Sequence, residues 1–326
     1  MRKRLDGLDF LKFICCFMVI CLHIPFTRAV SGIITPLSRI AVPIFFMITG
    51  YFYSATSETK KEKKQLLKIA RIFFWANTLY LIYSCSVNLI KGESVAKDFT
   101  LINFCKFIFL NESPFGGHLW YLGAILYVLI IIYFFEKRYS RDKLYFLIPF
   151  LLLFDLVFGK YSLLFIRKEI PFIFVRNFLF VGLPYFLIGD IIFKRRITIA
   201  RKHLLILICI FASTTLIERY LLNTFNLNVT RDHYISTSFL AVFTFMLACH
   251  YGNNPHSKIY KKCCSIGANL SLDIYIIHPI IISALAIIVQ LIDSQTINTL
   301  YVHTAPFVVF VVSIVISKFK MALCRK

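Results

Sequence analysis

Long apolar runs are the feature that most constrains how this chain folds. About ten runs of some 16–25 residues recur along 326 residues, and they cover 8–27, 34–54, 71–90, 117–135, 144–159, 175–193, 203–221, 234–250, 267–291 and 299–317. A helix of about 20 apolar residues crosses the hydrocarbon core of a bilayer. Hydrophobic residues make up 59% of the chain, against about 45–50% in soluble domains. The pattern predicts an all-α, polytopic membrane protein with about ten transmembrane helices.

The Lys and Arg residues are distributed unevenly between the two sides of the predicted membrane. If the N-terminus lies in the cytoplasm and ten helices alternate, 25 of the 37 Lys and Arg residues fall in cytoplasmic segments and ten fall outside. An excess of basic residues on the cytoplasmic side is the usual pattern of membrane proteins. We therefore predict cytoplasmic N- and C-termini, a location in the bacterial cytoplasmic membrane, and no nucleic-acid partner despite the net charge of +21. The first run is expected to stay as a helix, since it is too long and too charged for a cleaved signal.

Several function classes lack support in the sequence. It contains no phosphate-binding loop, no G-x-S-x-G, no H-E-x-x-H and no dinucleotide fingerprint, so ATP hydrolysis, serine-hydrolase chemistry and zinc hydrolysis are not indicated. The ten cysteines suggest no disulfide framework. The loops are too short for a separate soluble domain, so we expect one membrane domain over 1–326. We also expect no metal site.

The first apolar run carries three polar residues that are expensive in hydrocarbon. Asp9 lies one turn before Lys12 and would pair with it. Lys12 and His23 are eleven residues apart, so on a helix they share a face, offset by roughly 20° and about 16 Å along the axis. Asp or Lys at mid-membrane costs about 2.5–3.5 kcal/mol on insertion scales, and such residues often mark functional sites. Two alternatives remain open: Lys12 reaching the interface, and His23 bonded to a neighbouring helix.

A basic segment follows the second run. Arg39 lies near the outer end of that run and would meet His23 across a short hairpin. The cytoplasmic stretch KKEKKQLLKIAR then places Lys64, Lys68 and Arg71 at i, i+4 and i+7, on one helical face. This face would hold phosphate groups, although a solvated face or contact with lipid headgroups explains it equally well.

Two further histidines lie within apolar runs. His118, in GGHLWYLG, stands at the outer interface, where an aromatic belt explains its neighbours but not the histidine. His278 lies near mid-membrane and precedes Pro279, which lacks an N–H and leaves a backbone carbonyl free. Asp273 is a second buried acid a little over one turn earlier. A helix-bending device is the alternative interpretation of this last group.

Four stretches in this order resemble the bacterial integral-membrane acyltransferases called acyltransferase family 3. They are LDGLDFLKFICCFMVICLHIPF, SRIAVPIFFMITGYF with its basic continuation, GHLWYLGAILY and SLDIYIIHP. The family's first-helix pattern is a basic residue, ten residues, then His; here Lys12 stands where Arg is commoner, and His23 matches. The family's Arg-x-x-Arg pattern appears as Lys68-Ile69-Ala70-Arg71.

The resemblance implies an O-acyltransferase. Such enzymes move acyl groups, most often acetyl from acetyl-CoA, onto hydroxyls of cell-surface or lipid-linked saccharides, with no bound cofactor. On this basis Lys12, Lys64, Lys68 and Arg71 would hold the CoA head and His23 would be the general base. Arg39 and His118 would stabilise the oxyanion, with Asp9, Asp273 and His278 as supporting residues. A polytopic transporter or flippase of a lipid-linked saccharide is the alternative, although the internal repeats typical of transporters are not visible.

Overall fold

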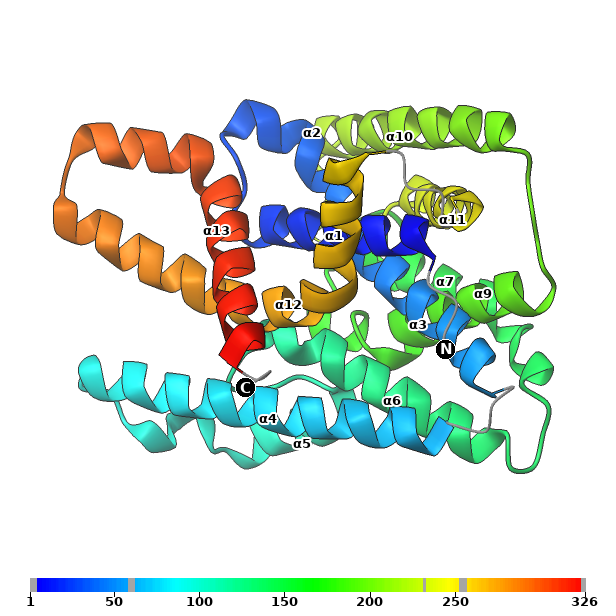
Figure 1. Cartoon of the computed structure of the whole chain (residues 1–326), viewed down its shortest axis with the longest axis horizontal. Coiled ribbons are helices and arrows are strands. Elements are labelled where there is room, and N and C mark those ends of the chain that lie inside the picture. The colour runs from blue at the N-terminus through cyan, green and yellow to red at the C-terminus, as the bar shows by residue number, and fades with distance from the viewer. Residues whose placement is uncertain (1–4, 58–61, 231–232, 252–256, 324–326) are drawn as a thin grey trace. The chain divides into compact units, whose positions relative to one another are not determined.

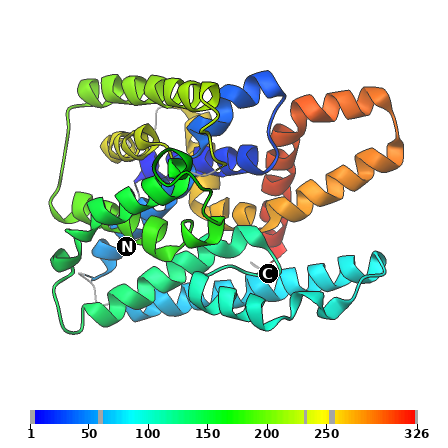
Figure 2. The same ribbon diagram turned by 180° about the vertical axis from the view of Figure 1, so that it is seen from behind.

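The computed structural model describes residues 5–57, 62–230, 233–251 and 257–323, and every regular element within these ranges is helical (Figures 1 and 2). The expected all-α class is therefore confirmed. The α-helices are α1 (Asp6–His23), α2 (Arg28–Ser38), α3 (Ala41–Ser57), α4 (Glu62–Ile90), α5 (Leu101–Leu110), α6 (Trp120–Phe135), α7 (Leu147–Asp155), α8 (Ser162–Phe165), α9 (Leu183–Lys194), α10 (Arg201–Thr224), α11 (Ile235–His250), α12 (Lys258–Ile292) and α13 (Gln295–Leu323). Short helical turns of the 3₁₀ or π type lie at Val95–Asp98, Gly117–Leu119, Arg141–Leu144, Leu156–Lys160, Phe172–Phe174 and Phe178–Gly182.

Six helical segments in the described part of the chain are long and apolar enough to cross a membrane. They are Arg28–Ala55, Glu62–Ile90, Gly117–Phe135, Arg201–Thr224, Lys258–Ile292 and Gln295–Leu323. Large apolar side chains stay exposed on them, among them Phe74 and Trp75 of α4, each 62% exposed. Such an apolar outer surface suits lipid and not water.

The expected ten spans are not confirmed. Four predicted runs form helices shorter or more charged than a span requires: α1 has 18 residues and three charged groups, α7 has 9 residues, α9 has 12 and α11 has 16. π-type turns at Leu156–Lys160 and Phe178–Gly182 interrupt the runs that contain α7 and α9. The orientation of the termini stays a prediction.

Proline explains where the first helix ends. The predicted run continues to residue 27, but α1 stops at His23 because Ile24 precedes Pro25 and has extended backbone angles, φ −133° and ψ 93°. A residue before proline is disfavoured in the helical region. His23 is therefore the last residue of its helix.

The chain packs as two compact units, each described by itself. Unit 1 comprises Met1–Phe45, Thr198–Thr224 and Tyr234–Lys326, and unit 2 comprises Phe46–Ile197 and Phe225–His233. This division into two packing units does not test the prediction of a single domain, which stays a prediction.

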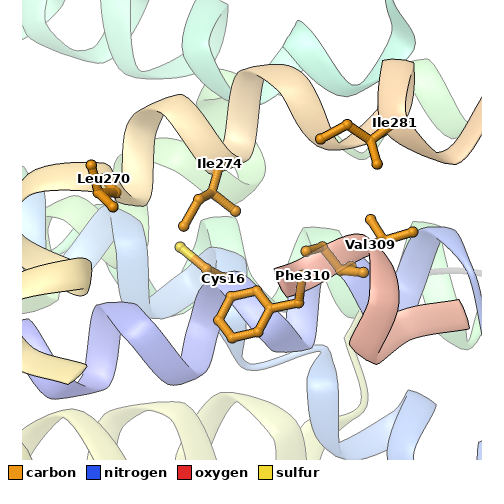
Figure 3. Packing of buried hydrophobic residues seen from close by; sticks show 7 residues of the cluster. Cys16, Leu270, Ile274, Ile281, Val309 and Phe310 are labelled. Atoms are coloured by element: carbon orange, nitrogen blue, oxygen red, sulfur yellow. The ribbon is translucent and has the colours of Figure 1, made fainter. Parts of the chain in front are cut away.

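In unit 1, α1 lies along α12, which forms a hairpin with α13 (Figures 1 and 2). Their shared core contains Cys16 and Ile20 from α1, Leu270, Ile274 and Ile281 from α12, and Val309 and Phe310 from α13 (Figure 3). Elsewhere in the unit, the Glu218 carboxylate of α10 accepts hydrogen bonds from the backbone N–H groups of Ile235 and Ser236, at 3.1 and 3.2 Å. These bonds satisfy two donors at the start of α11.

In unit 2, α3 and α9 make unusually close backbone contact. A β-carbon at Gly50 would stand 1.9 Å from the carbonyl oxygen of Phe186, and one at Gly189 would stand 2.0 Å from that of Met47. Small residues at such crossings are typical of membrane helices, whose backbones approach closely.

A buried polar network holds the ends of several unit 2 helices. Asp190 is fully buried and accepts hydrogen bonds from Arg141 Nη1 at 2.9 Å and Tyr145 Oη at 2.6 Å. Arg141 Nε also pairs with Glu136 at 2.7 Å, and Tyr53 donates to the same Glu136 at 3.0 Å. The network joins α3, α6, α9 and the segment that precedes α7.

Candidate functional site

Asp9 and Lys12 form the predicted ion pair on α1. Lys12 Nζ lies 2.9 Å from Asp9 Oδ1, and the exposed fractions of the two side chains are 18% and 6%. The pair spans one helical turn and is largely withdrawn from solvent. Pairing lowers the cost of placing either charge in an apolar helix.

His23 and His278 lie side by side, although they come from opposite ends of the chain. Their ring centroids are 4.9 Å apart and the ring planes are inclined by 56°. His23 ends α1 and is exposed, whereas His278 is in the interior of α12 and 0% exposed. Unit 1 therefore contains a histidine pair with one accessible ring and one buried ring.

The backbone of α12 holds the His278 ring. Its Nδ1 lies 2.8 Å from the carbonyl oxygen of Tyr275 and 3.1 Å from that of Ile274. The sequence predicted a free carbonyl at this point because Pro279 lacks an N–H. That carbonyl is the one on Tyr275, four residues before Pro279, and His278 contacts it.

Asp273 differs from its prediction as a buried acid. Its side chain is 22% exposed, and its carboxylate pairs at 2.6 Å with Lys320 of α13, which is 59% exposed. The prediction was wrong in this respect because the side chain points toward the end of α13, where an exposed lysine reaches it. Asp273 thus supports the α12–α13 hairpin.

The two predicted oxyanion donors lie in different units. Arg39 is half-buried in the turn between α2 and α3, in unit 1. His118 is 8% exposed, precedes α6 in unit 2, and packs edge-on against Tyr80 with ring centroids 4.5 Å apart. The approach of either residue to His23 stays a prediction.

Three of the four predicted donor-binding cations lie on the first turns of α4, and the fourth, Lys12, lies on α1. Lys64, Lys68 and Arg71 are all exposed, as a face that binds phosphate requires. Lys60 and Lys61, at the start of the basic segment, lie outside the described residues.

Sequence reasoning missed an acid–histidine pair in unit 2. Asp155 Oδ2 lies 2.7 Å from His233 Nδ1, and both side chains are buried. Lys160, five residues on, is 2% exposed and donates to the carbonyl of Val229 at 2.8 Å. An acid within the apolar run 144–159 was the available signal. The contacts join the connection between α10 and α11 to α7 and to the π-type turn after it.

Among the described residues, no cluster of three His, Cys, Asp or Glu side chains could hold a metal ion.

Comparison with known proteins places the chain in a family. A protein of Enterococcus faecalis named as an amino-acid racemase is 27% identical over an alignment that covers 94% of this chain and 46% of that protein. The chain thus spans about half the length of that relative. No solved structure matches. Residues 5–318, nearly the whole chain, match the acyltransferase domain of acyltransferase family 3, and this multi-pass membrane protein belongs to that family.

Proposed function

We propose that the protein transfers an acyl group, normally acetyl, from acyl-CoA to a hydroxyl of a cell-surface or lipid-linked saccharide in the bacterial cytoplasmic membrane. The observation that carries the proposal is the exposed His23 at the end of an apolar helix that also holds the Asp9–Lys12 pair. A chain of this family needs a base that substrate can reach, and His23 is such a group.

His23 supplies the proton transfer that the reaction requires. A sugar hydroxyl is a weak nucleophile near neutral pH, and a neutral imidazole within hydrogen-bond reach takes its proton as the oxygen attacks the thioester carbonyl. The tetrahedral intermediate then collapses, the carbon–sulfur bond breaks, and the ester forms. The departing CoA sulfur takes the proton from the imidazolium, so the histidine returns to its starting state.

The cations hold the donor and the developing charge. Lys64, Lys68 and Arg71 are exposed on α4 and suit the phosphates of the CoA head. Lys12 lies eleven residues before His23 on α1. It is proposed to contact the part of the donor that extends from the CoA head toward His23. Arg39 and His118 are the proposed donors of positive charge or hydrogen bonds to the oxyanion.

Two other functions receive less support. The racemase name describes a relative of which the match covers only 46%, so the proposal rests on the family instead. A transporter of a lipid-linked saccharide would move its cargo without adding an acyl group.

The test is transfer of radiolabel from acetyl-CoA to an extractable saccharide by membranes that contain the protein. The His23→Ala variant should lose about 10²–10⁴-fold in turnover, the usual contribution of a positioned base. The matched control is His203→Ala, which removes an exposed histidine from the first turn of α10. Normal transfer by folded His23→Ala protein would contradict the assignment of His23, and absence of transfer by the wild type would contradict the function.

A further inference from the structure

We propose that the first turns of α13 bind the saccharide acceptor and that this site recognises an uncharged, hydroxyl-rich sugar. The inference rests on the proposed acyltransfer and adds the part of its site that holds the acceptor. In the predicted orientation this end of α13 faces the outside of the cell. The inference starts from a cavity of about 510 Å³ in unit 1, lined by Gln295, Thr296, Thr299, Leu300 and His303. Sites for small ligands usually measure about 300–1,000 Å³.

The lining of the cavity is polar but contains no Lys, Arg, Asp or Glu. Gln295, Thr299 and His303 recur every four residues and so follow one line along the helix, with Thr296 and Leu300 beside them. An amide, two hydroxyls and an imidazole together donate and accept hydrogen bonds. The hydroxyls of a neutral sugar also donate and accept, so the lining matches such a ligand.

The polar groups of the lining are accessible. All five lining residues are exposed. Thr299 donates its hydroxyl hydrogen to the Gln295 carbonyl at 2.9 Å, which leaves the lone pairs of its oxygen for a ligand. A row of polar groups on an otherwise apolar helix is costly in hydrocarbon unless it contacts water, protein or a ligand. This end of α13 is therefore suited to a polar ligand and not to lipid chains.

A proline explains why this part of α13 leaves the packed core. Pro306 lies inside the helix and lacks an N–H, so the Val302 carbonyl loses its helical donor and the helix bends. The ribbon of α13 changes direction along its length (Figure 1). After the proline, Val309 and Phe310 are buried in the core with α1 and α12, whereas the lining residues before it are exposed. The bend thus places a polar face outside the core.

The cavity lies one helical turn from an aromatic cluster on either side of His23 in the chain. Phe307 follows His303 by four residues, about 6 Å along the axis. The Phe307 ring packs against the rings of Phe17 and Phe26, with centroids 5.1 and 5.3 Å away. Phe26 is three residues after His23. A sugar held in the cavity therefore extends over apolar rings, which suit its C–H faces, toward the proposed base.

The charges near the cavity favour a neutral sugar over an anionic one. Asp293, the exposed residue at the end of α12, lies two positions before Gln295. Its carboxylate repels a phosphate or carboxylate group and opposes the attraction that the start of a helix exerts on anions. The lining offers no lysine or arginine to pair with such a group.

Valine substitutions test the site while keeping its shape. The double variant Thr296→Val, Thr299→Val removes two hydroxyls and retains two β-branched side chains. It should raise KM for the extracted saccharide acceptor about tenfold, because lost hydrogen bonds weaken acceptor binding, and leave KM for acetyl-CoA unchanged. The matched control is Thr304→Val: the Thr304 hydroxyl also donates within α13, to the Leu300 carbonyl at 2.8 Å, but does not line the cavity. The same acceptor KM in the double variant and the control would overturn the inference.

A second measurement does not depend on acyl transfer. The probe is a dodecyl glucoside with a diazirine on its sugar, added to protein in a detergent that has no sugar headgroup. Irradiation should link the probe to residues 295–303 of the wild type, and about tenfold less to the double valine variant. The matching dodecyl glucuronide, which carries a carboxylate, should be linked there less. Equal linking by both probes would overturn the preference for a neutral sugar, and linking only at other segments would overturn the site.

The two experiments separate this inference from the proposed function. Wild-type protein that is linked at 295–303 but transfers no radiolabel would contradict acyltransfer and retain a sugar site. Wild-type protein that transfers radiolabel but is not linked there would retain acyltransfer and overturn the site on α13. If the double valine variant does not fold, linking of the wild type by the two probes decides.

Discussion

The carbonyl oxygen of Asp9 lies only 1.9 Å from the place where a β-carbon at Gly267 would stand. This contact sets the distance between α1 and α12, the two helices that carry His23 and His278. The obstacle is backbone and cannot rotate aside. A side chain at residue 267 therefore forces the helices apart.

We expect Gly267→Ala to lower transfer activity by at least tenfold and to lower the thermal stability in detergent. Overpacking of a tight contact typically costs about 1–3 kcal/mol, and the displacement also separates the two histidine rings. The matched control is Gly117→Ala, since a β-carbon at Gly117 meets nothing within 4 Å. Equal behaviour of the two variants would show that the contact does not control the spacing.

Substitutions of Asp9 and Lys12 can distinguish two roles of Lys12, neutralising the Asp9 carboxylate and contacting the donor. Lys12→Ala should be strongly destabilising, by about 3–5 kcal/mol if the pair behaves as a buried one, because Asp9 stays in an apolar helix without the ammonium. The double variant Asp9→Asn, Lys12→Ala should recover thermal stability but not activity, if Lys12 contacts the donor. Lys12→Arg should keep both. Recovery of activity in the double variant would make the pair purely structural.

The basic face of α4 should affect the donor and not the chemical step. Lys68→Ala and Arg71→Ala should raise KM for acetyl-CoA with little change in kcat, because they hold a part of the donor that does not react. Acetyl-pantetheine, which lacks the nucleotide phosphates, should respond much less. Lys63→Ala is the control, since Lys63 is exposed one residue before Lys64 and faces a different direction on the helix. Equal effects on both substrates would point to lipid contact or stability.

The buried Arg141–Asp190 pair of unit 2 should contribute far more to the free energy of unfolding than the more exposed Lys194–Asp142 pair. Arg141→Ala removes the positively charged partner of the fully buried Asp190 and should cost about 3–5 kcal/mol. Lys194→Ala removes a partly exposed pair with Asp142, at 3.3 Å, and should cost about 0–1 kcal/mol. Thermal denaturation in one detergent compares the two directly. A small effect of Arg141→Ala would mean that water replaces the guanidinium.

The membrane orientation predicts which loops are reached from outside the cell. Reporter fusions at 136–143 and 194–202 should be cytoplasmic, and fusions at 91–116 should be external, as the distribution of basic residues requires. The control is a C-terminal fusion, which should report the cytoplasm. External reporters at 136–143 would reverse the orientation and place the basic face of α4 on the wrong side for CoA.

The sequence by itself determined the helical class, the membrane character and the family. Apolar runs and basic segments act through composition and periodicity, which are local properties. The Asp9–Lys12 pair was also predictable, because residues three apart on a helix are neighbours. So was the free carbonyl before Pro279, because proline affects a residue four positions away.

Only the tertiary structure decided how these parts meet. That His23 faces His278 depends on the packing of two helices from opposite ends of the chain. That Asp273 pairs with Lys320 depends on the α12–α13 hairpin. Within the described residues, six segments are long and apolar enough to span, because α1 carries three charged groups, π-type turns shorten α7 and α9, and α11 has only 16 residues. Such outcomes arise from contacts between distant segments, and a local pattern of apolar residues contains no information about which helix becomes the neighbour of another.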